Sequence, residues 1–281
     1  MGGVLRLLLI ATAVVIAAAT ALLLSTTNAW RRDTAAKVAA LQAGSTARPG
    51  VYHPAVVEDL PAPVARYFRH TLKDGQPFVT SAVVTQQAEF FVNDNWRRLR
   101  ATQHFNSVPP GFVWDARITM APLMPADVRD AYLAGRGSMQ ATMFGVYSLV
   151  DQSGMAELNS GALQRYLGEA VWFPTVLLPG HAVAWSAIDD RSALATLVDG
   201  ETTVSLTFRF DDRDRLVETA GDRYAEQDGA YVLKPWRVAC SDHAAMQDIE
   251  IPRYCEVMWM GAQGPEPYWR GRVTSIVYSF N

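Results

Sequence analysis

Glu169 is the first candidate for chemistry in this chain, because Trp172 follows it within one helical turn. An apolar wall of this kind raises the pKa of a carboxyl group and suits it to act as a general acid. Arg165 lies one turn before Glu169, at the spacing of an ion pair on the surface of a helix. The surface ion pair is the favoured interpretation, and a hydrolase that uses Glu169 or an aspartate is an alternative.

Cys240 and Cys255 are the two cysteines of the chain, and the segments that hold them have the pattern of a β-hairpin in which they would face each other. A disulfide bond formed outside the cytoplasm would stabilise the fold by on the order of 3 kcal/mol. Two reduced, partly buried thiols are an equal alternative. Structural zinc sites take four ligands and His243 is the only histidine nearby, so we expect no metal.

The sequence contains none of the motifs that mark common enzymes. Ser138 and Ser148 lack the Gly-x-Ser-x-Gly pattern of a serine hydrolase, and the five histidines lack the close spacing of metal ligands on a helix. A glycine-rich phosphate loop is missing too. We therefore expect a protein without a cofactor, better suited to binding than to catalysis.

Residues 7–24 form an unbroken run of Leu, Ile, Val, Ala and Thr. As a helix this run would span ~27 Å, close to the thickness of the hydrocarbon core of a bilayer. A cleavable signal peptide is the alternative, since Arg6 precedes the run and residues 27–29 have small side chains suited to cleavage. The run exceeds the ~7–15 apolar residues of a signal sequence, and Arg31 and Arg32 follow it as a stop, so we expect an uncleaved single-pass anchor.

The rest of the chain has the composition of a globular domain, with 49% hydrophobic and 10% aromatic residues overall. Without residues 1–32, which hold three arginines and no acidic residue, 22 basic residues stand against 28 acidic ones. This balance argues against nucleic acid as a partner. We expect the anchor over residues 1–32, a linker over 33–57 that starts as a helical extension, and a single β-rich domain over 58–281.

Three short helices are expected in this part of the chain. The first covers residues 63–72, where apolar side chains recur every three to four positions after a proline. A brief second helix is expected over residues 124–135, with proline in its first turn and glycine at its end. The third follows a Ser160 cap and ends before Pro174.

Elsewhere, from Phe78 onward, apolar residues alternate with polar ones, as in half-buried strands of an antiparallel sheet. The connections are short and contain Asp-Gly, Asn-Asp or Asp-Asp, which hairpin turns prefer. The expected strands cover residues 79–92, 96–106, 112–120, 137–150, 183–188, 193–198, 204–210, 216–224, 235–240, 253–260 and 268–280.

All tryptophans except Trp30 and all of these strands fall in the expected domain. A strongly curved sheet has an inner face too wide to fill by itself, so inward aromatic side chains would line an apolar cleft beneath the third helix. Burial of an alkyl chain there would contribute ~0.8 kcal/mol per methylene. The candidate ligand-binding residues are Tyr166, Glu169, Trp172, Phe173, Trp185, Trp236, Trp259 and Trp269.

Several segments of this domain form a recognisable set: Gln-Arg-Tyr-Leu-Gly-Glu-Ala-Val-Trp-Phe-Pro-Thr at 164–175, Ile-Asp-Asp-Arg-Ser-Ala at 188–193, Phe-Arg-Phe-Asp at 208–211, Asp-Arg-Tyr at 222–224 and Tyr-Trp-Arg-Gly at 268–271. Together they resemble an uncharacterised bacterial family of membrane-anchored proteins, known only as a domain of unknown function. The likeness runs from about residue 60 to residue 280 and implies no activity.

A looser resemblance concerns shape. A long antiparallel meander crossed by one mid-chain helix, with a hairpin over 238–260 that includes Ile251-Pro252, is similar to the half-barrels of periplasmic lipoprotein carriers. Those proteins hold acyl chains between a curved sheet and helices on its concave side. The resemblance implies the same shape here and favours an extracytoplasmic domain over the cytoplasmic one that flanking charges narrowly favour.

The expected fold is therefore α+β and predominantly antiparallel β. It is a curved open sheet, or half-barrel, with a few helices on the concave side and a transmembrane helix at the N-terminus. The expected function is non-catalytic binding of an apolar or amphipathic ligand, such as a lipid or a lipidated peptide, by a protein anchored in the cell membrane. The first alternative is an envelope scaffold with a filled core whose surface binds another protein.

Overall fold

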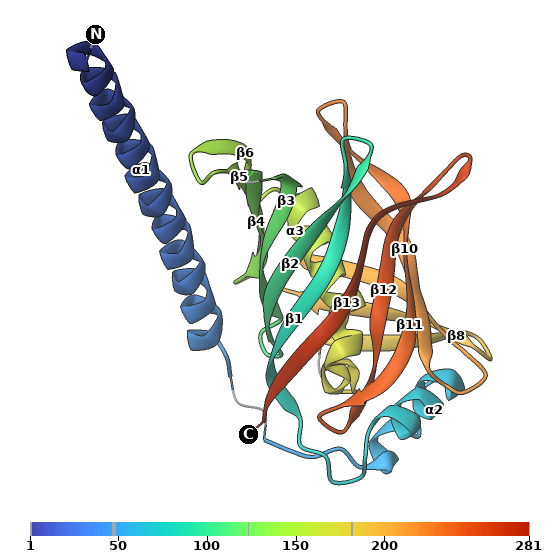
Figure 1. Ribbon diagram of the computed structural model, residues 1–281. Coiled ribbons are helices and arrows are strands. Elements are labelled where there is room, and N and C mark those ends of the chain that lie inside the picture. The colour runs from blue at the N-terminus through green and yellow to red at the C-terminus, as the bar shows by residue number, and fades with distance from the viewer. Residues whose placement is uncertain (1, 47–48, 123, 181, 281) are drawn as a thin grey trace.

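The computed structural model describes residues 2–46, 49–122, 124–180 and 182–280. Within these ranges, the long helix α1 (Gly2–Ala43) precedes a domain built on one large sheet (Figure 1). The other helical elements are η1 (Pro54–Val57), α2 (Ala62–Thr71), α3 (Ala156–Glu169), η2 (Ala170–Trp172) and η3 (Pro174–Leu177). The strands are β1 (Val79–Val92), β2 (Asn95–Asn106), β3 (Gly111–Ala121), β4 (Met124–Leu133), β5 (Arg136–Met143), β6 (Tyr147–Ser153), β7 (Val183–Asp189), β8 (Ser192–Asp199), β9 (Thr202–Phe210), β10 (Leu216–Gln227), β11 (Ala230–Met246), β12 (Ile249–Gly261) and β13 (Gly264–Phe280).

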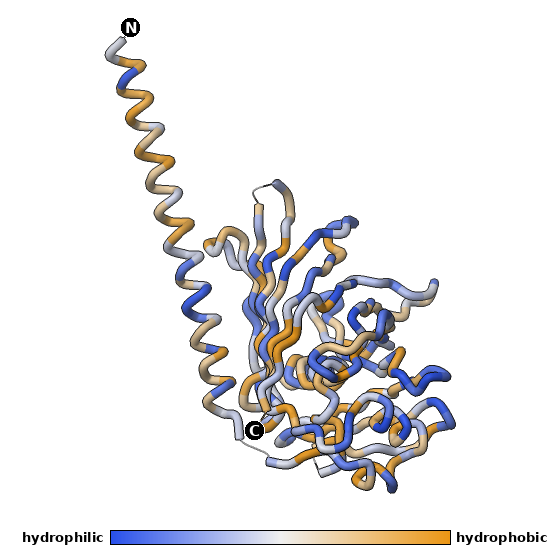
Figure 2. The backbone as a smooth tube through the Cα atoms, turned by 60° about the horizontal axis from the view of Figure 1, so that its bottom comes forward, coloured by the Kyte–Doolittle hydropathy of each residue, from blue (hydrophilic) through white to orange (hydrophobic). Residues whose placement is uncertain are grey.

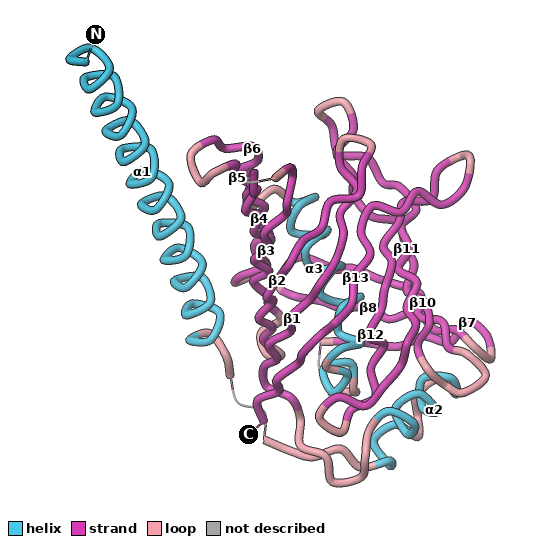
Figure 3. The backbone as a smooth tube through the Cα atoms, viewed as in Figure 1, coloured by secondary structure: helices cyan, strands magenta, loops and turns pink. Residues whose placement is uncertain are grey.

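The strands form one antiparallel sheet with the order β6-β5-β4-β3-β2-β1-β13-β12-β11-β10-β9-β8-β7. Two meanders, β1 to β6 and β7 to β13, join in the middle of the sheet, where β1 pairs with β13. In the described sheet the edge strands β6 and β7 do not pair with each other, so it curves without closing (Figures 1 and 3). The expected antiparallel, open half-barrel is confirmed.

Residues 124–135 do not form the expected helix: residues 124–133 are strand β4, and residues 134–135 are the turn to β5. Asp130 and Tyr132 face the concave side of the sheet, where they contact other parts of the domain, whereas Arg129 faces α1 on the convex side. Both faces of β4 are therefore buried. A strand covered on both faces loses the alternation of apolar and polar residues, so its sequence does not reveal it.

Residues 137–150, expected as one strand, belong to the hairpin of β5 and β6. Phe144 and Gly145 take φ values of 57° and 67°, and consecutive positive φ values are typical of tight hairpin turns. Most other strands match their expected positions to within a few residues, and α2 confirms the helix expected over 63–72.

Helix α3, which follows β6 in the chain and precedes the short helices η2 and η3, crosses the concave side of the sheet (Figure 3). It begins at Ala156, one turn before the expected Ser160 cap, and Met155 at its N-cap makes no side-chain hydrogen bond. Ser160 is thus an internal residue of the helix. Because α3 packs against β3 to β5 on one side and β9 and β10 on the other, it lies between the two arms of the sheet.

The half-barrel has two ends, which we call the α2 end, covered by α2, and the open end, where the β1–β2 and β10–β11 hairpins turn (Figure 1). Aromatic rings fill the α2 end. Phe105 lies with ring centroids 4.5 Å from Phe173 and 6.4 Å from both Tyr166 and Trp172, and all four side chains are at most 4% exposed. This end of the interior is an ordinary packed core.

Helix α1 runs without a break through the expected boundary at residue 32. Its N-terminal half, which contains the run 7–24, is exposed and is long and apolar enough to cross a membrane (Figure 2). Its C-terminal half lies on the convex side of β2 to β4, where Leu41 packs against Val113. The expected linker thus begins inside a docked helix, and residues 47–48 lie outside the described ranges.

Candidate functional site

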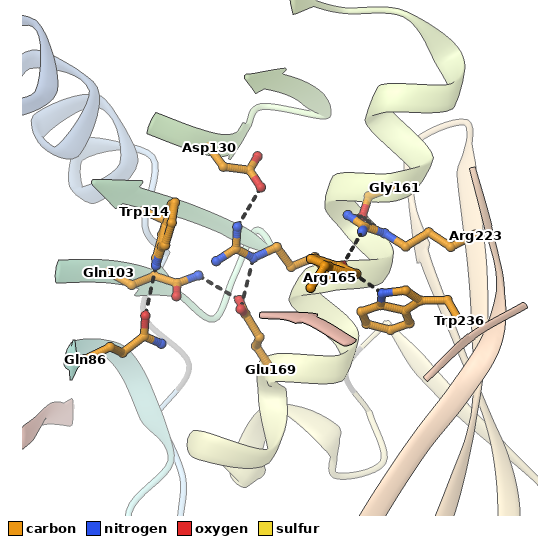
Figure 4. A network of polar contacts seen from close by, with 10 residues as sticks. Gln86, Gln103, Trp114, Asp130, Gly161, Arg165, Glu169, Arg223 and Trp236 are labelled. Carbon is orange, nitrogen blue, oxygen red and sulfur yellow. Dashed lines mark hydrogen bonds and ion pairs between the residues drawn. The ribbon is translucent and has the colours of Figure 1, made fainter. Parts of the chain in front are cut away.

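An ion-pair network occupies the concave face between α3 and the strands opposite it (Figure 4). Arg165 Nε donates a hydrogen bond to Glu169 Oε1 at 2.9 Å, and Arg165 Nη1 donates to Asp130 Oδ2 at 2.6 Å. Gln103 Nε2 donates to the other carboxylate oxygen of Glu169 at 2.7 Å. Each oxygen of Glu169 is therefore held, one by its own helix and the other by the sheet.

Helix periodicity and sheet register place these side chains together. Arg165 and Glu169 are one turn apart, so they project from the same side of α3. In the sheet, Gln103 pairs with Trp114, which pairs in turn with Asp130, so the three residues form a row across β2, β3 and β4. This row faces the two residues on α3.

Solvent reaches the network although it lies inside the curve of the sheet. The side chains of Arg165 and Glu169 are each 18% exposed, and that of Asp130 is 13% exposed. The expected Arg165–Glu169 pair is formed, but on the concave face and not on the outer surface. The Arg165 guanidinium lies 5.1 Å from the ring centroid of Phe112 and 4.9 Å from that of Trp114, and these aromatic faces replace part of its lost hydration.

The charges of the network depend on one another. Burial raises the pKa of the Glu169 carboxyl, and its bonds to Arg165 and Gln103 oppose part of that rise. Burial also disfavours the charged form of Arg165, but Glu169 and Asp130 outweigh this effect, so the pKa of the guanidinium is raised. Arg165 is therefore the cation that two carboxylates share, and it stays charged.

Two amide groups beside the network have atoms without a hydrogen-bond partner in the described part of the chain. Gln86 Oε1 accepts a hydrogen bond from Trp114 Nε1 at 2.9 Å, but Gln86 Nε2 is unpaired, as is Gln103 Oε1. Both side chains are at most 1% exposed, and an unpaired buried polar atom costs about 1–3 kcal/mol. Both atoms lie beneath the surface, so only a polar group that enters the network would pair with them.

A second group of side chains, the aromatic cluster, consists of Arg223, Trp236, Trp259 and Tyr268 on the opposite wall. Arg223 Nη2 donates to the Gly161 carbonyl of α3 at 3.1 Å, and its guanidinium lies 5.2 Å from the ring centroid of Trp236 (Figure 4). Trp236 Nε1 donates to Tyr268 Oη at 2.9 Å, and the Tyr268 ring stacks on Trp259 with centroids 5.8 Å apart. Among the described residues, no carboxylate pairs with Arg223.

Trp269 borders the same face, and its ring packs over Gly271. A Cβ atom at position 271 would lie 2.6 Å from both the Trp269 ring and the Cβ of Ala88. Real Cβ atoms do not approach other atoms so closely. Glycine at this position therefore allows the Trp269 ring to lie against β1.

We expect Gly271→Ala to displace the Trp269 ring and to lower the free energy of unfolding by about 1–3 kcal/mol, the usual cost of overpacking. Gly44→Ala is the control, because a Cβ there would come no closer than 3.5 Å to its neighbours. Urea unfolding followed by tryptophan fluorescence measures both variants. Equal midpoints for the two would contradict the packing at Gly271.

The structure divides the candidate ligand-binding residues into two groups. One group packs in the core, and its indole and phenol groups already donate to backbone carbonyls. It comprises Tyr166, Trp172, Phe173 and Trp185. The other group surrounds the network and the aromatic cluster on the concave face. It comprises Glu169, Trp236, Trp259 and Trp269. Glu169, Trp259 and Trp269 are partly exposed and have surface to offer a ligand in this conformation, whereas Trp236 is 4% exposed. In the first group, Trp185 is half-buried and the other three side chains are buried.

Four residues of the site escape prediction from the sequence: Gln86, Gln103, Asp130 and Arg223. A usable signal exists for the first two, because each is a polar residue at a position where the alternation of its strand calls for an apolar one. Asp130 is hidden by the helical spacing of β4. Nothing in the local sequence distinguishes Arg223 from a surface arginine.

The remaining reactive side chains lie apart from this site. Cys240 and Cys255 face each other across β11 and β12 and are joined by a disulfide bond. His243 Nε2 lies 2.7 Å from the Leu216 carbonyl oxygen. The described ranges hold no group of three or more side chains placed to bind a metal ion, and His181 lies outside those ranges.

Comparison with known protein families gives a match to a model described as a family of unknown function, DUF6920, over residues 58–278. It agrees with the resemblance inferred from the sequence segments between residues 164 and 271. A search of curated proteins finds no match.

The solved structures that match this structure share little sequence identity with the chain. A LolA superfamily protein from Nitrosomonas europaea is 9% identical, with a TM-score of 0.42 over 79% of this chain and 95% of that chain. A DUF1329 family protein from Desulfovibrio piger is 6% identical, with a TM-score of 0.40 over 77% and 90%. A β-barrel-like DUF1849 protein from Brucella abortus is 10% identical, with a TM-score of 0.25 over 72% and 99%. Similarity at this level carries no conclusion about function.

Proposed function

We propose that this chain, which belongs to the DUF6920 family of unknown function, is a membrane-anchored module that binds an amphipathic ligand such as a lipid or a lipidated peptide. The ligand lies on the concave face, between the network around Arg165 and the aromatic cluster. One observation carries the proposal: the inner face of the sheet holds charged side chains that solvent reaches, within surroundings that are otherwise apolar.

The apolar part of the ligand has suitable partners on this face. Half-buried apolar side chains pack against the core on this face, two of them within the aromatic cluster itself, and an alkyl chain that covers them gains ~0.8 kcal/mol per methylene. They are Phe90, Met120, Met139, Trp259, Tyr268 and Trp269.

The polar part of the ligand has suitable partners as well. The unpaired Gln86 Nε2 and Gln103 Oε1 are a buried donor and a buried acceptor, which a polar group that enters the network would satisfy. Arg223 offers a guanidinium whose partners are a carbonyl, a phenol and an aromatic ring, with no carboxylate among the described residues to neutralise it. Arginine in this setting suits a carboxylate or phosphate group. An anionic amphipathic ligand therefore matches the face best.

The anchor and its orientation belong to the same proposal. The apolar window of α1 has a mean hydropathy of 2.8 and no buried residue, as expected of a segment that lies in lipid. The disulfide between Cys240 and Cys255 supports an extracytoplasmic domain, because such bonds persist in oxidising compartments. We propose a single-pass protein of the cell membrane whose domain lies outside the cytoplasm.

A scaffold that binds another protein is the second candidate function. The packed α2 end favours it, since Tyr166, Trp172 and Phe173 are at most 4% exposed and leave no space for a guest there. The binding module and the scaffold make different predictions only for the open end of the half-barrel. The binding module requires a ligand on the concave face there, and the scaffold does not.

Native mass spectrometry of the full chain extracted in detergent tests the proposal. We expect a co-purifying species with the mass of a lipid, which Arg223→Met removes or weakens. Arg237→Met is the matched control, because Arg237 follows Trp236 on the same strand, faces the convex side and pairs with Glu218. Absence of any adduct across several lipid classes, or equal loss in both variants, would leave the scaffold as the better account.

A further inference from the structure

The turn between β5 and β6 touches α1 where the apolar run of the helix ends. Thr26 Oγ1 donates a hydrogen bond to the Phe144 carbonyl oxygen at 3.1 Å. A Cβ on Gly145 would lie 2.9 Å from Thr26 Oγ1, so the turn and the helix approach closely. At ~1.5 Å per residue, Thr26 lies ~3 Å along the axis beyond Leu24, the last residue of the run. The turn is therefore level with the point at which α1 would leave the hydrocarbon core.

This turn is apolar and exposed. Val146 is 57% exposed and Tyr147 is 69% exposed. Residues 137–150 contain no charged side chain, whereas the turns of the β1–β2 and β10–β11 hairpins contain Asp94 and Asp228. The composition of the β5–β6 turn thus differs from that of these two turns.

The strand that follows the turn extends this surface. Leu149 on β6 is 46% exposed, and β6 is an edge strand of the sheet. In water an exposed apolar edge strand invites aggregation, and proteins usually protect such edges with charges or a cover. Contact with lipid would cover the apolar side chains. Tyrosine is also enriched at the interface between membrane and water, where its ring and hydroxyl group each find a suitable environment.

We propose that the β5–β6 turn inserts into the bilayer interface beside α1 and forms a second membrane contact of the domain. The inference rests on the proposed anchor, since the height of the turn is defined by α1. In Figure 1 the N-terminal half of α1 continues past the side of the sheet on which the β1–β2 and β5–β6 hairpins turn. Two contacts, α1 and the turn, fix the domain with its open end towards the membrane, so a lipid would reach the concave face directly from the bilayer.

Quenching of a fluorescent label by lipids with spin-labelled acyl chains tests this contact. The full chain is placed in nanodiscs with one environment-sensitive label on a single introduced cysteine, the native cysteines being joined by a disulfide. Ser148→Cys reports on β6, and Ser186→Cys on β7 is the matched control, because both are exposed serines on edge strands. Leu22→Cys reports on the apolar run of α1.

We expect the label at position 148 to be quenched several-fold more strongly than the label at position 186. Strong quenching at position 22 with equal, weak quenching at positions 148 and 186 would overturn the inference and leave the anchor intact. Weak quenching at all three positions would contradict the anchor and the inference together. The two failures are therefore distinguishable in one series of measurements.

Discussion

We expect Arg165→Met to lower the free energy of unfolding by about 3 kcal/mol. This value is at the lower end of the cost of breaking a buried ion pair, because solvent reaches the network. Methionine keeps apolar contact with the rings of Phe112 and Trp114 but leaves Glu169 and Asp130 without the cation they share. Urea unfolding of the full chain in detergent measures the change. Arg209→Met is the control, since Arg209 is 63% exposed and lies 3.9 Å from Glu218.

The effect of Arg165→Met depends on pH, and the sign follows from the raised pKa of Glu169. A carboxyl group whose pKa is higher in the folded chain binds its proton more tightly there, so stability is greatest below the unfolded pKa and is lost as pH rises through the folded one. Without Arg165 the pKa of Glu169 rises further, so the variant loses more stability than the wild type as pH rises above about 4.3, the ordinary pKa of a glutamate carboxyl. Adding Glu169→Gln removes this extra loss. An equal loss of stability from Arg165→Met and Arg209→Met, at every pH, would contradict the role of the network.

We expect Arg129→Met to release the C-terminal half of α1 from the sheet at a cost of about 3 kcal/mol, the lower end of the range for breaking a buried ion pair, because the Asp33 side chain is 52% exposed. The Arg129 side chain is 3% exposed on the convex face and pairs with Asp33. It donates to Thr34 Oγ1 at 2.6 Å and to Gln140 Oε1 at 2.7 Å, and its guanidinium lies 4.3 Å from the ring centroid of Trp30. One turn of α1, from Trp30 to Thr34, thus contacts the sheet through a single cation.

Asp115 supplies the means to test this contact by a double-mutant cycle. Burial raises the pKa of the Asp115 carboxyl, while the Trp30 N–H, which donates to it at 2.8 Å, and the charge of Arg129 lower it. Asp115→Asn combined with Arg129→Met should therefore recover part of the lost stability. Hydrogen exchange over residues 30–43 should quicken in Arg129→Met and stay unchanged over α2. Unchanged exchange in α1 would contradict its docking through Arg129.

Much of the sheet follows from the sequence because most strands have one face in the core and one in water. Where a second layer covers the outer face, as α1 covers β4, the alternation disappears and the helical spacing of residues 124–135 misleads. The break within residues 137–150 depends on two positive φ values, and neither Phe144 nor its neighbours predict one. A strand with one face in water can thus be predicted from its own residues, whereas the docking of α1 on the convex face cannot.

The site divides in the same way. The Arg165–Glu169 pair follows from helix periodicity, and the facing positions of Cys240 and Cys255 follow from the hairpin. The bonds from Gln103 to Glu169 and from Arg165 to Asp130 join residues 66 and 35 positions apart, and they require the register of three strands. The side of the sheet on which the ion pair lies is set by the same long-range packing, which is why the expected surface pair is found on the concave face.

Cross-linking from the site itself decides whether a ligand lies on the concave face. Benzoylphenylalanine in place of Trp259 is activated by light in the membrane, and Tyr254 on the same strand is replaced in the control, since it lies beside Arg272 on the convex face. Mass spectrometry then identifies the adducts. We predict a lipid or lipidated peptide attached at position 259 and none at position 254. Adducts at neither position, or equally at both, would contradict a ligand held by the concave face.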